Sequence, residues 1–137
     1  MTLLVVDASV VLSWCFEDEA SPECDALIDR VTHDGAAVPG LWSLEIANAL
    51  VVAERRRRIE PADSAAFLAL LEALPFDVDT ETSARAWRET MALARLHGLS
   101  VYNASYLELA ARRGAELATA DDALRQAAQR AGVNVVA

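Results

Sequence analysis

The sequence contains no lysine, so each of its twelve basic residues is an arginine. Schiff-base catalysis and the Walker-type phosphate loop both depend on a lysine amine, and this chain therefore supports neither. The acidic pocket of receiver domains also normally combines a strand-end aspartate with a lysine. This one absence excludes several classes of α/β protein.

Long apolar runs are also missing, and cysteine is scarce. No run approaches the roughly 18 residues that span a bilayer, and segment 1–7 reaches Asp7 without a basic residue, unlike a signal peptide. Cys15 and Cys24 have neither zinc-ligand nor C-x-x-C spacing. We therefore expect a cytoplasmic protein without a membrane segment, in which both thiols are packing residues.

Positive charge is scarce as well, and the net charge is −9. Proteins that bind nucleic acid through overall charge neutralise phosphates with many basic side chains, so this chain would need metal ions or a local basic patch. Hydrophobic residues, in contrast, make up 54% of the 137 positions, which is enough for a core. Without a linker or low-complexity tract, residues 1–137 should form a single domain.

Short apolar runs alternate with longer helical stretches along the sequence. The run at 3–6 is apolar throughout and ends at Asp7, as expected of a strand buried on both faces of a parallel sheet. Similar runs lie at 36–38, 76–78, 116–119 and 133–136. The alternation predicts an α/β domain in which helices flank a central, mostly parallel sheet of about five strands, with right-handed crossovers.

Capping residues mark the helices between these runs. Ser21 followed by Pro22 is typical of a helix start, and four glycines are placed where helices should end. The predicted helices are a short one near Ser9 and longer ones at 22–34, 42–58, 61–74, 82–97, 100–113 and 122–131. The pair at 42–58 and 61–74 could form a hairpin, and an exposed face of this very apolar pair would need a partner.

Three acidic residues are placed where strands of such a sheet end. Asp7 follows the first run directly, Asp121 lies two residues beyond Thr119, and Glu45 is in the first turns of the helix after Val38. Ligand sites of open α/β sheets lie beyond the carboxyl ends of the strands, so these side chains should converge on one rim. Each also has a simpler interpretation: Asp7 and Asp121 as helix caps, and Glu45 as a solvated side chain.

Together, the three acids indicate a metal site. Carboxylates in a poorly solvated cleft repel each other, and a hard divalent cation bound through oxygen relieves that repulsion. The expected ion is Mg²⁺ or Mn²⁺. Asn48 lies one turn after Glu45 on the same helix face and could support the acids.

Four segments, taken in order and spacing, resemble the PIN-domain nucleases, and among them the VapC-type toxins of bacterial toxin–antitoxin pairs. These segments are Val5–Ser9, Glu45–Leu50, Leu99–Ala110 and Leu117–Asp121. The resemblance implies a three-layer PIN-like fold and a metal site of Asp7, Glu45 and Asp121. It also implies cleavage of RNA by metal-dependent phosphodiester hydrolysis, without a nucleophilic serine or cysteine. It further implies that Ser9 and Thr119 support this site, that the chain forms a homodimer, and that a cognate antitoxin protein binds it.

Asn103 departs from the family pattern, which normally has an aspartate, the third of four acids, after Tyr102. An amide oxygen can still ligate a hard cation, so we include Asn103 among the metal-binding and catalytic residues, but the lost charge weakens Mg²⁺ binding. Alternatively, Asn103 only belongs to the first turn of a helix capped by Ser100. The substitution predicts a weakened ribonuclease.

The only dense basic segment is Arg55, Arg56, Arg57 and Arg58. These arginines should lie at the C-terminal end of a helix whose dipole they complement, which makes a solvated helix end the simplest interpretation. The alternative is a contact with RNA phosphates flanking the cleft.

Two other functions fit the same residues. The first is a catalytically inactive PIN-like domain that binds metal or a basic antitoxin-like peptide, with Asn103 marking the loss of catalysis. The second is a flap-type or DNA-directed nuclease, although the chain lacks insertions that would thread a DNA branch. Cleavage of RNA and of DNA with Mg²⁺ would separate these possibilities.

Overall fold

The structure is a computed structural model that describes residues 3–137, and over this range strands and helices alternate as expected. The strands are β1 (Leu4–Val6), β2 (Ala36–Val38), β3 (Phe76–Val78) and β4 (Glu116–Ala118). The helices are α1 (Ala8–Ser13), α2 (Pro22–Asp34), α3 (Trp42–Arg55), α4 (Pro61–Ala73), α5 (Thr82–Arg85), α6 (Met91–His97), α7 (Val101–Arg113) and α8 (Asp122–Arg130). A 3₁₀ turn, η1 (Glu17–Glu19), follows α1, and a π-helical turn, η2 (Ala86–Thr90), joins α5 to α6.

The sheet is parallel, with the strand order β3-β2-β1-β4. Every residue of β1 is buried, because this strand is central and is covered on both faces. The expectation of about five strands needs correction. The segment at 133–136 forms a single parallel bridge with β4, between Val135 and Leu117. The Leu117 N–H donates to the Asn134 carbonyl, and the Leu117 carbonyl accepts from the Val136 N–H.

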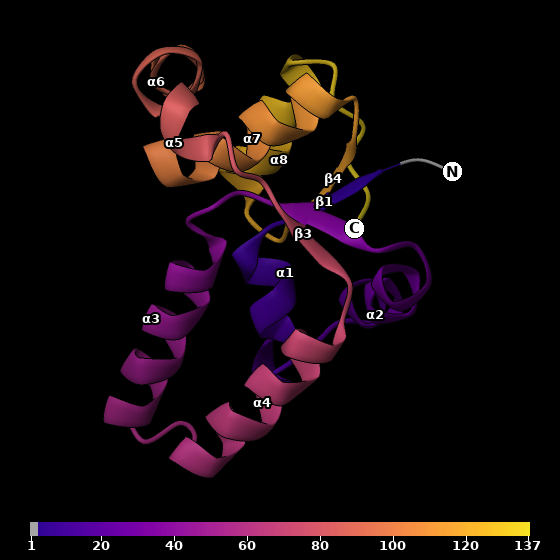
Figure 1. The fold of residues 1–137 in the computed structure, drawn as a ribbon, viewed down its shortest axis with the longest axis vertical. Helices are drawn as coiled ribbons and strands as arrows, with labels where there is room; N and C mark the ends of the chain where they lie inside the picture. The colour runs from indigo at the N-terminus through magenta and orange to yellow at the C-terminus, as the bar shows by residue number, and fades with distance from the viewer. Residues whose placement is uncertain (1–2) are drawn as a thin grey trace.

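Helices cover both faces of the sheet, giving the three layers expected of a PIN-like fold (Figure 1). Helices α1 to α4 lie on one side, and α5 to α8 lie on the other. The core is formed mainly by apolar residues of the strands and of helices on both faces of the sheet, α1, α2 and α3 on one side and α7 and α8 on the other. Within residues 3–137, no helix is long and apolar enough to cross a bilayer.

Most helix starts and ends lie where capping residues predicted them. The Ser21 hydroxyl accepts from the Cys24 N–H, the Ser100 hydroxyl accepts from the Asn103 N–H, and Gly98 ends α6 in the left-handed conformation. Two boundaries differ from expectation. Helix α3 ends at Arg55 rather than at residue 58, and the expected helix at 82–97 contains the π-helical turn η2.

Helices α3 and α4 diverge from their connecting loop toward the sheet, so they form an open V rather than a closely packed hairpin (Figure 1). Apolar residues of both helices are exposed. They are Leu44 and Val51 on α3, and Leu68 and Leu70 on α4. Both helices of this pair therefore expose apolar side chains.

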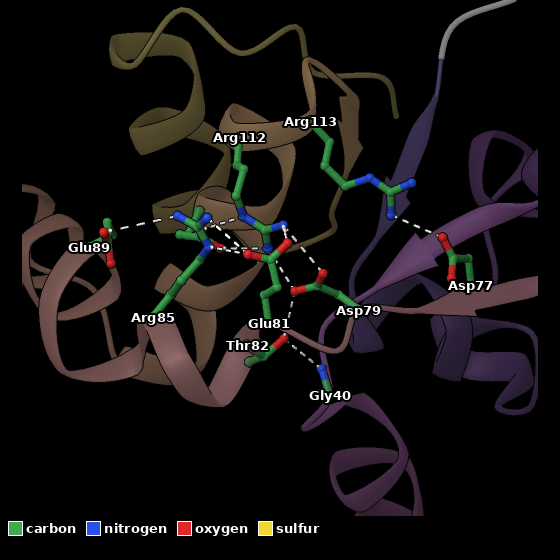
Figure 2. Close-up of polar contacts among 10 residues, drawn as sticks. Gly40, Asp77, Asp79, Glu81, Thr82, Arg85, Glu89, Arg112 and Arg113 are labelled. Carbon is green, nitrogen blue, oxygen red and sulfur yellow. Dashed lines mark hydrogen bonds and ion pairs between the residues drawn. The ribbon is translucent and has the colours of Figure 1, made fainter.

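An ion-pair network holds the start of α3 against α7 (Figure 2). Arg112 of α7 lies 2.6 Å from the Asp79 carboxylate and 2.7 Å from that of Glu108. The Thr82 hydroxyl donates to Asp79 and accepts from the backbone N–H of Gly40, two residues before α3. The network thus fixes two of the elements that carry candidate site residues, α3 and α7.

Candidate functional site

The site lies where the strand order reverses, between the carboxyl ends of β1 and β4. Val6 pairs with Ala118 in the ladder, so the next residues, Asp7 and Thr119, emerge side by side. The Asp7 N–H also donates to the Ala118 carbonyl, which extends the ladder by one bond. Open α/β sheets bind ligands at this switch point.

Asp7 is the central residue of the site and is only 3% exposed. Its Oδ1 accepts from the Ser9 hydroxyl at 2.6 Å and from the Val10 N–H at 3.1 Å, and its Oδ2 accepts from the Thr119 hydroxyl at 2.5 Å. Burial raises the pKa of the Asp7 carboxyl above its usual 3.8, outweighing these hydrogen bonds, and the nearby charge of Asp121 raises it further. The negative charge is therefore costly in the folded protein.

Ser9 and Thr119 connect Asp7 to the loop that follows β4. The Ser9 hydroxyl accepts from the Ala120 N–H, and the Thr119 hydroxyl accepts from the Asp121 N–H. Both hydroxyls therefore receive one hydrogen bond from the loop and donate another to Asp7. Both expected supporting residues lie in direct contact with Asp7.

Asp121 caps α8, as the simpler interpretation of this residue predicted. Its Oδ1 accepts from the Leu124 N–H at 2.9 Å. Within residues 3–137, its Oδ2 has no hydrogen-bond partner. Capping fixes one carboxylate oxygen and leaves the other for a ligand, so the structural and the functional roles of Asp121 are compatible.

Glu45 is paired with a residue that the sequence did not single out, Tyr106. The Tyr106 hydroxyl donates to Glu45 Oε1 at 2.5 Å, joining α7 to α3. Burial raises the pKa of Glu45 above its usual 4.5, and the charge of Asp7 adds to the increase. Burial and the adjacent Glu45 raise the pKa of Tyr106 well above its usual value, so the hydroxyl keeps its proton and remains a donor.

Asn103 and Asn48 have no side-chain hydrogen bond within residues 3–137. Asn103 is half-buried in the first turn of α7, one turn before Tyr106, and its backbone N–H is held by Ser100. Asn48 is exposed and lines a shallow hollow farther along α3, together with Arg56 and Arg58. The structure therefore links Asn103 to the site through α7, but it does not join Asn48 to the acids.

The carboxylate and amide oxygens of the candidate residues are suitable ligands for a divalent cation, but they do not form a complete coordination shell. Asp7 and Asp121 interact electrostatically, as do Asp7 and Glu45, and both interactions raise a carboxyl pKa. A hard cation would relieve this repulsion. Among residues 3–137, however, no three His, Cys, Asp or Glu side chains lie together closely enough to hold a metal ion. A cation here would therefore be held directly by fewer than three of these side chains, with water completing its coordination, as is usual for Mg²⁺.

The basic segment Arg55, Arg56, Arg57 and Arg58 divides into two parts. Arg58 ion-pairs with Asp18 and Glu19 of η1, and its guanidinium stacks 4.3 Å from the centre of the Phe16 ring. The other three side chains are exposed, and Arg57 has a left-handed backbone with φ 58°. Three of the four arginines are therefore exposed to solvent without a stacking partner.

Comparison with known proteins identifies the fold. A model of the PIN domain matches residues 4–130. The chain belongs to the PIN domain family. Ribonuclease VapC3 of Pyrobaculum aerophilum is 28% identical over 123 residues, which are 90% of this chain and 92% of that protein. The crystal structure of PAE2754 from Pyrobaculum aerophilum matches with a TM-score of 0.72 at 25% identity, covering 98% of this chain and 84% of that chain.

These matches confirm the resemblance to VapC-type PIN domains, which is based on four short segments of the sequence. Both comparisons cover nearly the whole chain, so this PIN domain includes every candidate residue from Asp7 to Asp121. PIN-domain nucleases generally use divalent metals, which agrees with the coupled carboxylates beyond β1.

Proposed function

We propose that this PIN domain is a Mg²⁺-dependent endoribonuclease and acts as the toxin of a toxin–antitoxin pair. The observation that carries the proposal is the buried Asp7 carboxylate at the switch point, whose raised pKa reflects burial and the charge of Asp121. A buried acid with a perturbed pKa in such a position is typical of a functional site. The relative named Ribonuclease VapC3 supports RNA as the substrate.

The metal-binding residues in this proposal are Asp7, Glu45 and Asp121, with Asn103 as a neutral fourth ligand. Mg²⁺, or Mn²⁺ in its place, would supply charge neutralisation at the scissile phosphate. Ser9 and Thr119 hold the Asp7 carboxylate in a fixed orientation. Asp121 is held by its capping bond, so the two aspartates keep their positions when substrate arrives.

Asn103 should weaken the activity without abolishing it. Three acids give less negative charge than four, so the cation would bind less tightly and would polarise its surroundings less. Asn103→Asp should therefore raise both Mg²⁺ affinity and the rate of RNA cleavage. Equal activity of the two proteins, measured side by side, would contradict this part of the proposal.

The exposed V of α3 and α4 supports an apolar protein partner. Between the helices lies a hollow of about 300 Å³ lined mainly by apolar residues, among them Trp42, Ile46, Leu68 and Leu71. The Trp42 indole N–H is buried and has no hydrogen-bond partner within residues 3–137. We propose an antitoxin segment as the partner, a homodimer as the state of the toxin, and the cytoplasm as its location.

The deciding experiment incubates the purified chain with total RNA in Mg²⁺, in Mn²⁺ and in EDTA. We expect metal-dependent cleavage that Asp7→Asn abolishes, and no cleavage of double-stranded DNA under the same conditions. An exposed neighbour, Asp122→Asn, controls for the loss of one charge. Cleavage that continues in EDTA, or that survives Asp7→Asn, would overturn the proposed function.

The second candidate function is an inactive PIN-like domain that binds a basic peptide at the acids. The neutral Asn103 is the observation that favours it, because it removes one of the four expected charges. Such a domain would bind a peptide rich in arginine, and its wild type would cleave no RNA; cleavage that appears only after Asn103→Asp would identify Asn103 as the cause of the loss. The cleavage experiment with this variant separates the two functions.

A further inference from the structure

The Tyr106 hydroxyl is buried, and burying a hydroxyl destabilises the fold unless the hydroxyl is hydrogen-bonded. The side chain is 1% exposed and lies among the core residues of α7, where a phenylalanine would fill the same space. Its hydroxyl donates to Glu45 Oε1. A buried hydroxyl must be hydrogen-bonded, and here the acceptor is a residue of the candidate site.

Glu45 needs this contact more than the other acids do. Asp7 and Asp121 are short, and backbone N–H groups at the starts of α1 and α8 hold their carboxylates. Glu45 has a longer side chain with more rotatable bonds, which costs more entropy to order. Within residues 3–137, the only hydrogen bond to its carboxylate comes from Tyr106.

We propose that Tyr106 is a positioning residue that holds Glu45 in the single orientation required at the site. The hydroxyl donates to Oε1, whereas Oε2 accepts no hydrogen bond within residues 3–137 and is the freer of the two oxygens for a ligand. Because Tyr106 lies one turn after Asn103 on α7, the same contact sets Glu45 relative to Asn103. The importance of this contact for RNA cleavage rests on the proposed function, whereas the ordering of Glu45 does not.

The test compares Tyr106→Phe with Tyr102→Phe, an exposed tyrosine one turn earlier on the same helix. NMR relaxation of the Glu45 side-chain carbons, recorded without metal, should show an ordered carboxylate in the wild type and in Tyr102→Phe. In Tyr106→Phe, the same carbons should become mobile. Equal order in all three proteins would overturn the positioning role.

Mn²⁺ binding, measured by titration calorimetry without RNA, gives a second readout. Loss of a residue that orients a ligand typically weakens metal binding about tenfold, so Tyr106→Phe should bind Mn²⁺ about tenfold more weakly. On a Glu45→Ala background, the same substitution should have no further effect, because its effect is transmitted through Glu45. An undiminished effect on that background would show a general structural role and would overturn the proposal.

RNA cleavage separates this inference from the function on which it depends. Under the proposed function, Tyr106→Phe should lower kcat and leave KM for RNA unchanged. A wild-type protein that cleaves no RNA with either metal would overturn the proposed function. The relaxation measurement would still decide whether Tyr106 orders Glu45.

Discussion

The Thr119 hydroxyl donates a hydrogen bond to the Asp7 carboxylate, although the two residues are 112 positions apart in the sequence. The contact follows from the parallel register of β1 and β4, which places the residues after Val6 and Ala118 next to each other. Thr119 is fully buried and also accepts from the Asp121 N–H. One side chain therefore connects both aspartates of the candidate site.

Thr119→Val should lower stability and RNA cleavage together. Valine keeps the shape of threonine but leaves Asp7 Oδ2 without its donor and the Asp121 N–H without its acceptor, which should cost about 1–3 kcal/mol in the free energy of unfolding. Urea denaturation measures this loss. Thr80→Val, at an exposed threonine, should change neither property, and a comparable loss there would show that the effect is not specific to the site.

Asp7→Asn should raise stability at neutral pH while abolishing cleavage. The folded pKa of Asp7 is raised, so the ionised carboxyl is less favourable in the folded chain than in the unfolded one. The advantage of asparagine should be present above the folded pKa and should disappear as pH falls through it. Thermal unfolding of both proteins across this range is the measurement, and a neutral-pH variant that unfolds earlier than wild type would contradict the prediction.

Arg112→Ala should be much more destabilising than the same change at its neighbour, Arg113 (Figure 2). Arg112 pairs with Asp79 and Glu108, whose side chains are only 7% and 6% exposed. Removing it leaves two nearly buried carboxylates short of countercharge, at a cost of about 3 kcal/mol. Arg113 forms an exposed pair with Asp77, so its loss should cost less than about 1 kcal/mol. Equal midpoints of urea denaturation would contradict this ranking.

The network around Asp79 should also make stability depend on pH in the acid range. Partial burial raises the pKa of Asp79, but the hydrogen bonds and charge of Arg112 outweigh it, so the pKa lies below its usual 3.8. The ionised Asp79 carboxylate therefore makes its full contribution to stability above pH 3.8. This contribution is lost as the pH falls through the lowered pKa of the folded protein. The stability difference between wild type and Asp79→Asn should follow that course, and a difference that grows in acid would contradict it.

Replacing Arg55, Arg56 and Arg57 together by alanine should weaken RNA binding and make it less sensitive to salt. Three lost phosphate contacts would reduce the slope of log affinity against log salt by about 2 for single-stranded RNA. Alanine at three other exposed arginines, Arg88, Arg95 and Arg130, removes the same charge elsewhere and serves as the control. Identical slopes in both triple variants would contradict the RNA contact and favour the simpler interpretation, in which the segment is a solvated helix end.

The sequence predicted those parts of the site that depend on strand ends. Asp7, Thr119 and Asp121 directly follow two strands, and parallel pairing brings such positions together whatever the helices do. The α/β fold was predicted from the alternation of short apolar runs with helical stretches and the family from the resemblance of four segments, and both are confirmed. The assignment of Asp7, Glu45, Asn103 and Asp121 as metal ligands stays a prediction.

Contacts between helices could not be predicted. Tyr106 reaches Glu45 across 61 residues because α7 packs over the sheet toward α3, and no local pattern encodes that approach. Arg58 was assigned to a basic segment, but its pairing with Asp18 depends on how η1 folds back. Single pairings of this kind are decided by tertiary packing, which a periodic pattern does not contain.

The central place of β1 in the sheet has a consequence for synthesis. The first strand to be made must wait for β4, which the ribosome produces only after β2, β3 and helices α1 to α7. Until β4 pairs with β1, Asp7 lacks its bond from Thr119 and the charge of Asp121 beside it. A growing chain therefore cannot complete the proposed RNA-cleaving site before the ribosome has synthesised β4 and the start of α8.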